Sequence, residues 1–178
     1  MPIKSENEVI DAALYRVAEQ MLVAARTAPK GKGFESIELK IVQGDTIIEI
    51  ADELTRLGVE NDIPSFRRDA ENIRKAPVML LLGAKIASIG LKKCGMCGFA
   101  NCAEKDKNPS IPCVFNITDL GIAVGSAVSI AADCRVDNRV MYTVGQAVKN
   151  MNILNSNTVV IYAIPLSAFS KNIFFDRN

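Results

Sequence analysis

The stretch APVMLLLGA, residues 76–84, holds a continuous apolar run that follows directly after Pro77. Such a run, set between a proline and a glycine, predicts a strand that is buried on both of its faces. Lys85 interrupts the apolar stretch well short of the ~20 residues that a membrane-spanning helix needs. Buried strands of this kind are typical of sheets that are covered by helices.

Helical and strand patterns alternate on both sides of this run. Ser5 and Glu8 predict a capping box at the start of the first helix, because each side chain can bond the backbone amide of the other residue. Gly58 is expected to end the second helix, and Ser65 is expected to cap the third. The predicted helices cover residues 5–29, 45–60, 65–77, 118–134 and 137–151, and the predicted strands cover 36–42, 78–84 and 158–165.

This order of elements predicts an α/β (α+β) fold, in which helices layer a mixed sheet within a single domain over residues 1–178. The one break in the order is a cysteine-rich insert, expected over residues 92–116. The aromatic residues of the tail are expected either to strap the domain or to dock on a partner subunit. They are Phe169, Phe174 and Phe175.

The overall composition argues against several classes of function. The 21 Lys and Arg residues nearly balance the 20 Asp and Glu residues, so we expect no general grip on nucleic acid or on an anionic membrane. The chain has no histidine, which excludes Ser–His and Cys–His catalysis and His-ligated zinc. Charged residues stand at the N-terminus where a signal peptide needs an apolar core, so we expect a cytoplasmic protein.

Four of the five cysteines lie within KKCGMCGFANCAEKDKNPSIPC, residues 92–113. The spacing, Cys94-x2-Cys97-x4-Cys102-x10-Cys113, lacks the two close pairs that are typical of structural zinc. A redox pair would use only Cys94 and Cys97 and would leave the other two without a role. Four thiolates, three of them close in sequence, are what a [4Fe–4S] cluster needs. The cluster is therefore the favoured interpretation, with zinc and redox thiols as the alternatives.

The residues around these cysteines also fit a cluster. Gly95 and Gly98 let the backbone curl around it and bring amide groups near its sulfides. Lys92 and Lys93 add positive charge beside a group that is net negative. Cys134 lies in the apolar segment SIAADC and is interpreted as a buried core residue.

The motif CGMCGFANCAE resembles the small four-cysteine cluster module of the corrinoid iron–sulfur protein and of the electron-transport complex B subunits. In that module, a C-G-x-C-G-x-x-x-C pattern is followed by a more distant cysteine. The resemblance implies that a [4Fe–4S] cluster is ligated by Cys94, Cys97, Cys102 and Cys113, with Cys134 as the alternative fourth ligand. The chain as a whole is similar to a family of bacterial and archaeal proteins that are described as containing a ferredoxin domain.

The segments AARTAPKGKGFESIELKIV, RKAPVMLLLGA and TDLGIAVGSAVSIAADCRVDNR resemble the nitroreductase family. That resemblance implies a nitroreductase-like scaffold and a homodimer with an FMN at its interface. The residues that would line the flavin are Arg26, Thr27, Ala28, Lys30 and Gly31. Lys171 and Arg177 in the tail would add contacts to the phosphate. The alternative for the loop APKGKG is a flexible segment with solvated lysines.

Two functions of different classes follow from these patterns. The first is a redox protein that transfers single electrons through a [4Fe–4S] cluster to a redox partner protein or a small-molecule electron acceptor. With FMN bound, it would be a flavin-dependent oxidoreductase. The second is a metal-stapled interaction or sensor module without catalytic activity. A hydrolase or transferase is disfavoured, since the chain lacks histidine and has no phosphate-binding loop motif.

Overall fold

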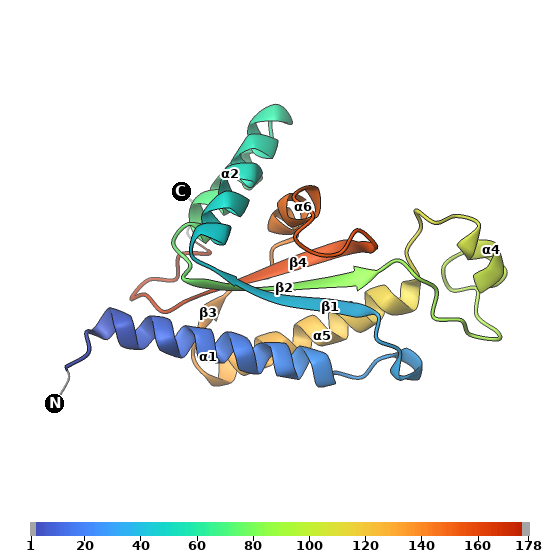
Figure 1. Ribbon diagram of the computed structural model, residues 1–178, viewed down its shortest axis with the longest axis horizontal. Helices are drawn as coiled ribbons and strands as arrows, with labels where there is room; N and C mark the ends of the chain where they lie inside the picture. The colour runs from blue at the N-terminus through green and yellow to red at the C-terminus, as the bar shows by residue number, and fades with distance from the viewer. Residues whose placement is uncertain (1–2, 176–178) are drawn as a thin grey trace.

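A four-stranded antiparallel sheet forms the middle layer of the computed structural model, which describes residues 3–175 (Figure 1). Its strands are β1 (Ile37–Gln43), β2 (Val78–Lys85), β3 (Asp137–Asn138) and β4 (Thr158–Ser167). They lie in the order β1-β2-β4-β3, and every neighbouring pair is antiparallel. β2 is therefore a central strand with a hydrogen-bonded partner on each edge.

The predicted buried strand is confirmed as β2, and its side chains enter two separate cores. Leu80 and Leu82 belong to one core, whereas Met79 and Leu81 belong to the other. All four side chains are fully buried. Because successive side chains of a strand point to opposite faces, an unbroken apolar run is what two covered faces require.

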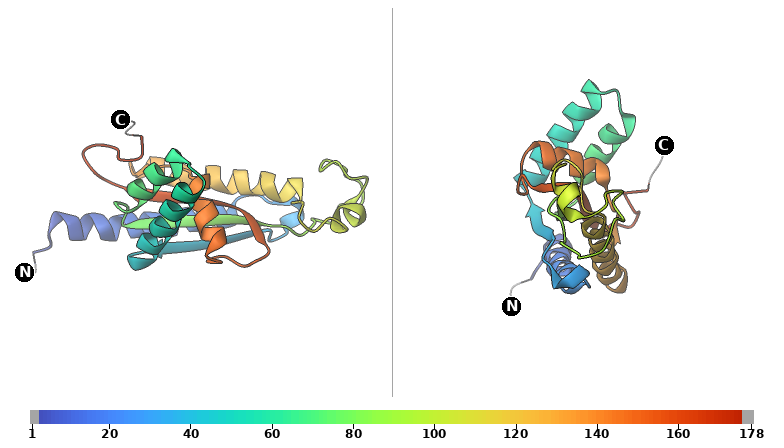
Figure 2. Two further views of the ribbon diagram at one scale, coloured as in Figure 1. Left: turned by 90° about the horizontal axis from the view of Figure 1, so that it is seen from above. Right: turned by 90° about the vertical axis from the view of Figure 1, so that its right-hand side faces the viewer.

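Two long helices cover one face of the sheet. α1 (Glu6–Thr27) and α5 (Val114–Asp133) lie side by side there, as Figure 1 and Figure 2 show. Their buried stripes are rich in alanine, which lets the two helices approach closely. The predicted capping box is confirmed, because the Ser5 hydroxyl accepts from the Glu8 amide while the Glu8 carboxylate accepts from the Ser5 amide.

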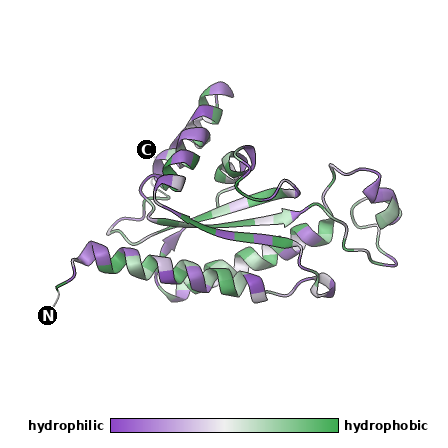
Figure 3. Ribbon diagram, in the orientation of Figure 1, coloured by the Kyte–Doolittle hydropathy of each residue, from purple (hydrophilic) through white to green (hydrophobic). Residues whose placement is uncertain are grey.

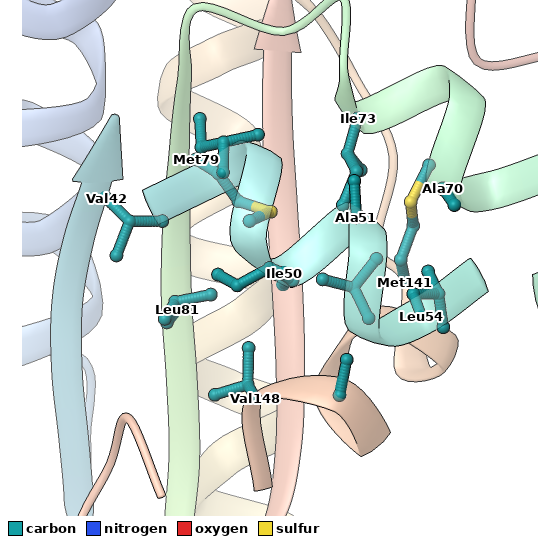
Figure 4. Close-up of a cluster of buried hydrophobic side chains, with 14 of the residues drawn as sticks. Val42, Ile50, Ala51, Leu54, Ala70, Ile73, Met79, Leu81, Met141 and Val148 are labelled. Atoms are coloured by element: carbon teal, nitrogen blue, oxygen red, sulfur yellow. The ribbon is translucent and has the colours of Figure 1, made fainter. Parts of the chain in front are cut away.

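Three shorter helices cover the opposite face. They are α2 (Asp45–Glu60), α3 (Pro64–Ile73) and α6 (Tyr142–Asn150). Figure 4 shows the core beneath them, in which Ile50 of α2 faces Leu81 of β2. In Figure 3, α1 carries alternating apolar and hydrophilic residues, as expected for a helix with one face on a core and one in water.

Two helix ends differ from the sequence-based expectation. α2 does not stop at Gly58 but continues to Glu60, because Gly58 packs against α3, where a Cβ would stand 3.0 Å from the Phe66 Cβ. α3 is not capped by Ser65. Pro64 takes its first helical position, where the helix does not use the amide that proline lacks.

α5 begins at Val114 rather than at Thr118. It is therefore 20 residues long, and within residues 3–175 it is the one helix that could cross a membrane by length and composition. In the fold one side of α5 packs against α1 and β2, while positions on its other side are exposed. Residues 137–138, predicted as part of a helix, form the strand β3 instead, because they pair with the end of β4.

The tail that follows β4 straps its own domain. Phe174 is fully buried in the core beneath α2, α3 and α6. Arg139 donates from Nη1 to the Phe174 carbonyl oxygen at 2.7 Å, and its guanidinium lies 5.4 Å from the centre of the Phe175 ring. The structure thus supports the strap for Phe174, whereas Phe169 and Phe175 are 54% and 55% exposed.

Gly145 lets α6 lie directly on β4, because a Cβ at this position would overlap the Ile161 carbonyl oxygen. We expect Gly145→Ala to lower the free energy of unfolding by about 3 kcal/mol, since backbone atoms would have to move apart. Gln146→Ala, at the exposed neighbouring position, is the control and should change stability by less than about 0.5 kcal/mol. Urea denaturation measures both variants, and equal midpoints would contradict the close approach.

Candidate metal centre

The cysteine insert projects from one end of the sheet (Figure 1, Figure 2). It leaves the sheet after Lys85, contains the short helix α4 (Cys102–Asp106), and ends where α5 begins at Val114. Residues 114–116, which the sequence pattern assigns to the insert, form the first turn of α5. The base of the insert is therefore built by β2 and α5, two elements that are fixed in the core.

One narrow cavity inside the insert is lined by all four predicted ligands, which are Cys94, Cys97, Cys102 and Cys113. All four are free cysteines, the last of them buried and the other three half-buried. Ile89 and Phe115 supply apolar parts of the wall, and Lys105 also lines the cavity. The structure thus places around one cavity the four cysteine residues that the sequence spacing singled out, although no three of them converge closely enough to hold a single metal ion.

The first two cysteines are held by a glycine turn. Gly95 and Gly98, which follow Cys94 and Cys97, have positive φ angles of 106° and 88°. The Gly98 amide donates to the Gly95 carbonyl oxygen at 3.0 Å and closes the turn around Cys97. Glycine adopts these angles without strain, so the two glycines allow the chain to curve around the cavity.

The other two cysteines stand at helix N-termini. Cys102 is the first residue of α4 and follows the N-cap Asn101, whose side-chain oxygen accepts from the Glu104 amide at 2.9 Å. Cys113 is the N-cap residue of the long helix α5. The dipole of a long helix favours negative charge at this end, which suits a thiolate.

Cys134 lies far from this cavity. Cys113 and Cys134 stand at opposite ends of the 20-residue helix α5. A helix rises about 1.5 Å per residue, so the two cysteines are roughly 30 Å apart. The Cys134 sulfur is 3.9 Å from the Gln20 Oε1 atom, and the residue is exposed. The geometry therefore rules out Cys134 as the fourth ligand. Its interpretation as a buried core residue is also wrong, because the end of α5 reaches the surface.

Two buried polar side chains form hydrogen bonds with the backbone where the insert leaves the sheet. Asn116 of α5 donates through Nδ2 to the Lys85 and Ala87 carbonyl oxygens at 2.9 and 2.6 Å. Lys105 of α4 donates through Nζ to the intervening Ile86 carbonyl oxygen at 2.8 Å. Three successive carbonyl groups are thus held by the same two helices that position two of the cysteines.

The end of α1, the helical turn η1 (Gly31–Gly33) and the link between them contain the five predicted flavin residues, which are Arg26, Thr27, Ala28, Lys30 and Gly31. Several of their polar groups have partners within the chain. Lys30 donates through Nζ to three carbonyl oxygens at the end of α1, the shortest of these bonds being 2.6 Å. Arg26 pairs with Glu35, and the Thr27 hydroxyl donates to an α1 carbonyl oxygen at 3.0 Å. Lys30 is therefore bound to the chain rather than solvated.

The same loop touches the wall of the cysteine cavity. The Gly31 amide donates to both oxygens of the buried Asp119 carboxylate, at 3.2 and 3.1 Å. A Cβ on Gly31 would overlap the Ile89 side chain and stand 3.5 Å from Phe115, and both of these residues line the cavity. The predicted flavin loop and the cysteine cavity thus share a wall. Arg177, the predicted phosphate contact, lies outside the described residues.

Three residues of the site, Asn116, Asp119 and Lys105, were not predicted from the sequence. Asn116 and Asp119 are buried three positions apart on the apolar stripe of α5. An amide and a carboxylate on such a stripe are unusual, because buried polar groups need partners, and that signal could have found them. Lys105 gives no comparable signal, since it is one lysine among several in a polar segment.

Solved structures with a similar overall fold include nitroreductases. Nitroreductase CinD from Lactococcus lactis, in complex with nicotinic acid, matches with a TM-score of 0.63 at 14% identity, covering 95% of this chain and 81% of that one. An FMN-dependent nitroreductase from Clostridium difficile matches with a TM-score of 0.56 at 15% identity, covering 88% and 76%. The chain therefore has a nitroreductase-like α/β fold, which confirms the predicted fold class.

Sequence comparison gives the family within this fold. The chain is 39% identical over 180 residues to an uncharacterized protein from Archaeoglobus fulgidus, with 97% of this chain and 94% of the relative covered. The model of a family described as "Uncharacterized protein containing a ferredoxin domain (DUF2148)" matches residues 110–177. The chain belongs to this family. The matched segment begins after three of the four predicted ligands, so the support for those three comes from the shared cavity.

We expect Asn116→Ala to loosen the base of the insert, because two hydrogen bonds to Lys85 and Ala87 are lost. The free energy of unfolding should fall by about 1–3 kcal/mol. Hydrogen–deuterium exchange should accelerate at residues 85–92 and stay unchanged in β4. Asn108→Ala, at an exposed position of the same insert, is the control. Equal exchange in the two variants would show that other contacts hold the base.

Proposed function

We propose that this chain is a cytoplasmic redox protein that holds a [4Fe–4S] cluster through Cys94, Cys97, Cys102 and Cys113. The observation that carries the proposal is the convergence of these residues on one cavity, from a glycine turn and two helix N-termini. Four cysteines without histidine are the donor set of such a cluster. The ferredoxin domain in the description of the family supports the same chemistry.

The sequence spacing of the cysteines favours a cluster over a single zinc ion, because it lacks the two close pairs that are typical of structural zinc. Zinc would draw four sulfurs to about 2.3 Å from one centre, whereas a cube gives each thiolate a different iron and keeps the sulfurs further apart. In the part of the chain that the structure describes, no three His, Cys, Asp or Glu side chains converge closely enough to hold one ion. The four cysteines nevertheless border the same cavity.

In this proposal the protein shields one side of the redox centre and exposes the other. The bound cluster would supply reversible one-electron transfer. Ile89 and Phe115 keep water from one side of the cavity, whereas Met96, between the first two ligands, is 67% exposed. The insert projects from the domain (Figure 2), so a redox partner protein or a small-molecule electron acceptor can approach it directly. The balanced net charge gives no reason to expect nucleic acid or a membrane as partner.

FMN is a second candidate cofactor. One structure with a similar fold is named an FMN-dependent nitroreductase, and the loop around Gly31 touches the wall of the cysteine cavity. Within one chain the loop does not form a phosphate cradle, because Lys30 is bound to carbonyl oxygens and Arg26 pairs with Glu35. The proposed electron transfer therefore does not require the flavin.

We further propose that the protein is a homodimer that forms through α5. Residues 120–132 carry no charge, and their exposed positions include Gly121, Ile122 and Gly125. Neither glycine has an atom of another element within 4 Å of the place of a Cβ, so packing within the chain does not explain them. Glycine in a helix is about 1 kcal/mol less favourable than alanine. An uncharged face of small residues can pair with its own copy across a two-fold axis, because no like charges meet there.

Absorbance and metal analysis of anaerobically purified protein test the cluster. We expect a broad shoulder near ~400 nm with about four irons and matching sulfide per chain. Cys97→Ser should lose most of the colour and iron, because one iron loses its thiolate. Cys134→Ser should keep both, because its position is remote from the cavity.

The same samples distinguish the alternatives. A colourless protein with one zinc per chain would replace the redox role by a metal-stapled interaction or sensor module. Full iron content in Cys97→Ser would overturn the ligand assignment. Flavin bands beside the cluster absorption would make the chain a flavin-dependent oxidoreductase.

Gly125→Glu tests the dimer. The two carboxylates would face each other across the two-fold axis, so we expect light scattering to give the mass of a monomer instead of a dimer. Val59→Glu, at an exposed position of α2 on the opposite layer, is the control and should keep the dimer. A dimeric Gly125→Glu variant would place the interface elsewhere on the surface.

A further inference from the structure

Lys105 is a buried lysine that lines the cysteine cavity. Its relative exposure is 3%, whereas its neighbours Glu104, Asp106 and Lys107 are all exposed. Lysine is almost never fully buried unless its charge is paired, because removing an ammonium group from water is unfavourable. The burial of this one side chain therefore needs an explanation in its surroundings.

The partners of Lys105 within the chain balance its charge only weakly. Its Nζ donates to the Ile86 carbonyl oxygen at 2.8 Å, and that acceptor is neutral. Its ion-pair partner is Asp106, whose carboxylate oxygen is 3.6 Å away on a side chain that is 56% exposed. The same oxygen accepts a shorter bond of 2.6 Å from the Ser88 hydroxyl. A carboxylate so exposed is screened by water and compensates a buried ammonium poorly.

The cysteine cavity offers the missing negative charge. A [4Fe–4S] centre with four thiolate ligands is net negative, and reduction adds one electron and so one further negative charge. Ile89 and Phe115 reduce the water in this part of the wall, so charges inside it interact more strongly than on the surface. A positive charge held beside the centre would stabilise the reduced form more than the oxidised form.

We propose that Lys105 is the buried counter-ion of the cluster and raises its reduction potential. This inference rests on the proposed function, since it requires a cluster in the cavity. The redox step takes one electron from an external low-potential donor, and no proton is transferred. Lys105 does not exchange electrons itself. It is a positioning residue that acts through its charge, besides anchoring the base of the insert.

Redox titration followed by electron paramagnetic resonance of the reduced cluster tests this role. In Lys105→Gln the charge is lost while a neutral hydrogen-bond donor remains. We expect the ratio of reduced to oxidised cluster at a fixed potential to fall about tenfold, which corresponds to about 59 mV for a one-electron couple. Lys105→Arg keeps the charge and should restore most of the wild-type potential. If Lys105 served only to anchor the insert, the reduction potentials of the two variants would not depend on whether the side chain at this position is charged.

Lys107→Gln is the matched control, because it removes the same charge from an exposed position two residues further on. Its shift should be much smaller and should shrink with added salt, since water and ions screen an exposed charge. If Lys105→Gln retains its iron and has the wild-type potential, or shifts no more than Lys107→Gln, the counter-ion role is wrong. Wild-type protein without iron would instead remove the proposed function itself.

A second variant covers the case in which Lys105→Gln fails to fold or to bind iron. Lys105→Met removes the charge and keeps an unbranched side chain of similar length at the buried position. Its potential should fall by about as much as that of Lys105→Gln, because the charge is lost in both variants. A wild-type potential in Lys105→Met, with its iron retained, would overturn the counter-ion role.

Discussion

Burial of both faces of β2 is the constraint on which the rest of the structure depends. Its side chains alternate between two cores, and each core must be closed by a layer of helices. β1 and β4 satisfy its hydrogen bonds on the two edges, so this part of the sheet cannot shift without breaking the centre of the fold. The insert starts where this strand ends, and the cysteine cavity therefore stands on the most firmly held part of the molecule.

Much of this architecture could be predicted from the sequence, because burial requires a regular spacing of apolar residues along long elements. α1, α2 and β2 follow from their apolar patterns, and the capping box of α1 follows from Ser5 and Glu8. The predictions fail where a contact with another element overrides the local signal. Gly58 stays inside a helix because α3 packs on it, and residues 137–138 form a strand because β4 lies beside them. No local pattern contains either contact.

In the candidate site, too, one part could be predicted from the sequence and another part could not. The spacing of the four cysteines is visible in the sequence, and the structure places all four around one cavity. The contacts that hold this cavity were not visible, because each joins residues far apart in the chain. Asp119 bonds the Gly31 amide, and Asn116 holds carbonyl groups at the end of β2. The sequence therefore predicts which residues meet more readily than what keeps them in place.

The cysteine insert and the central sheet are completed at different points along the chain. The residues that line the cavity lie between positions 88 and 115, and two of the side chains that hold its base, Lys105 and Asn116, lie in the same part of the chain. β2 completes its pairing only with β4, where Ala84 lies opposite Val160. Short loops close at a smaller entropic cost than long ones. On the ribosome all four cysteines emerge before β4 is made, so the order of assembly allows the metal to enter a chain whose sheet is still unfinished.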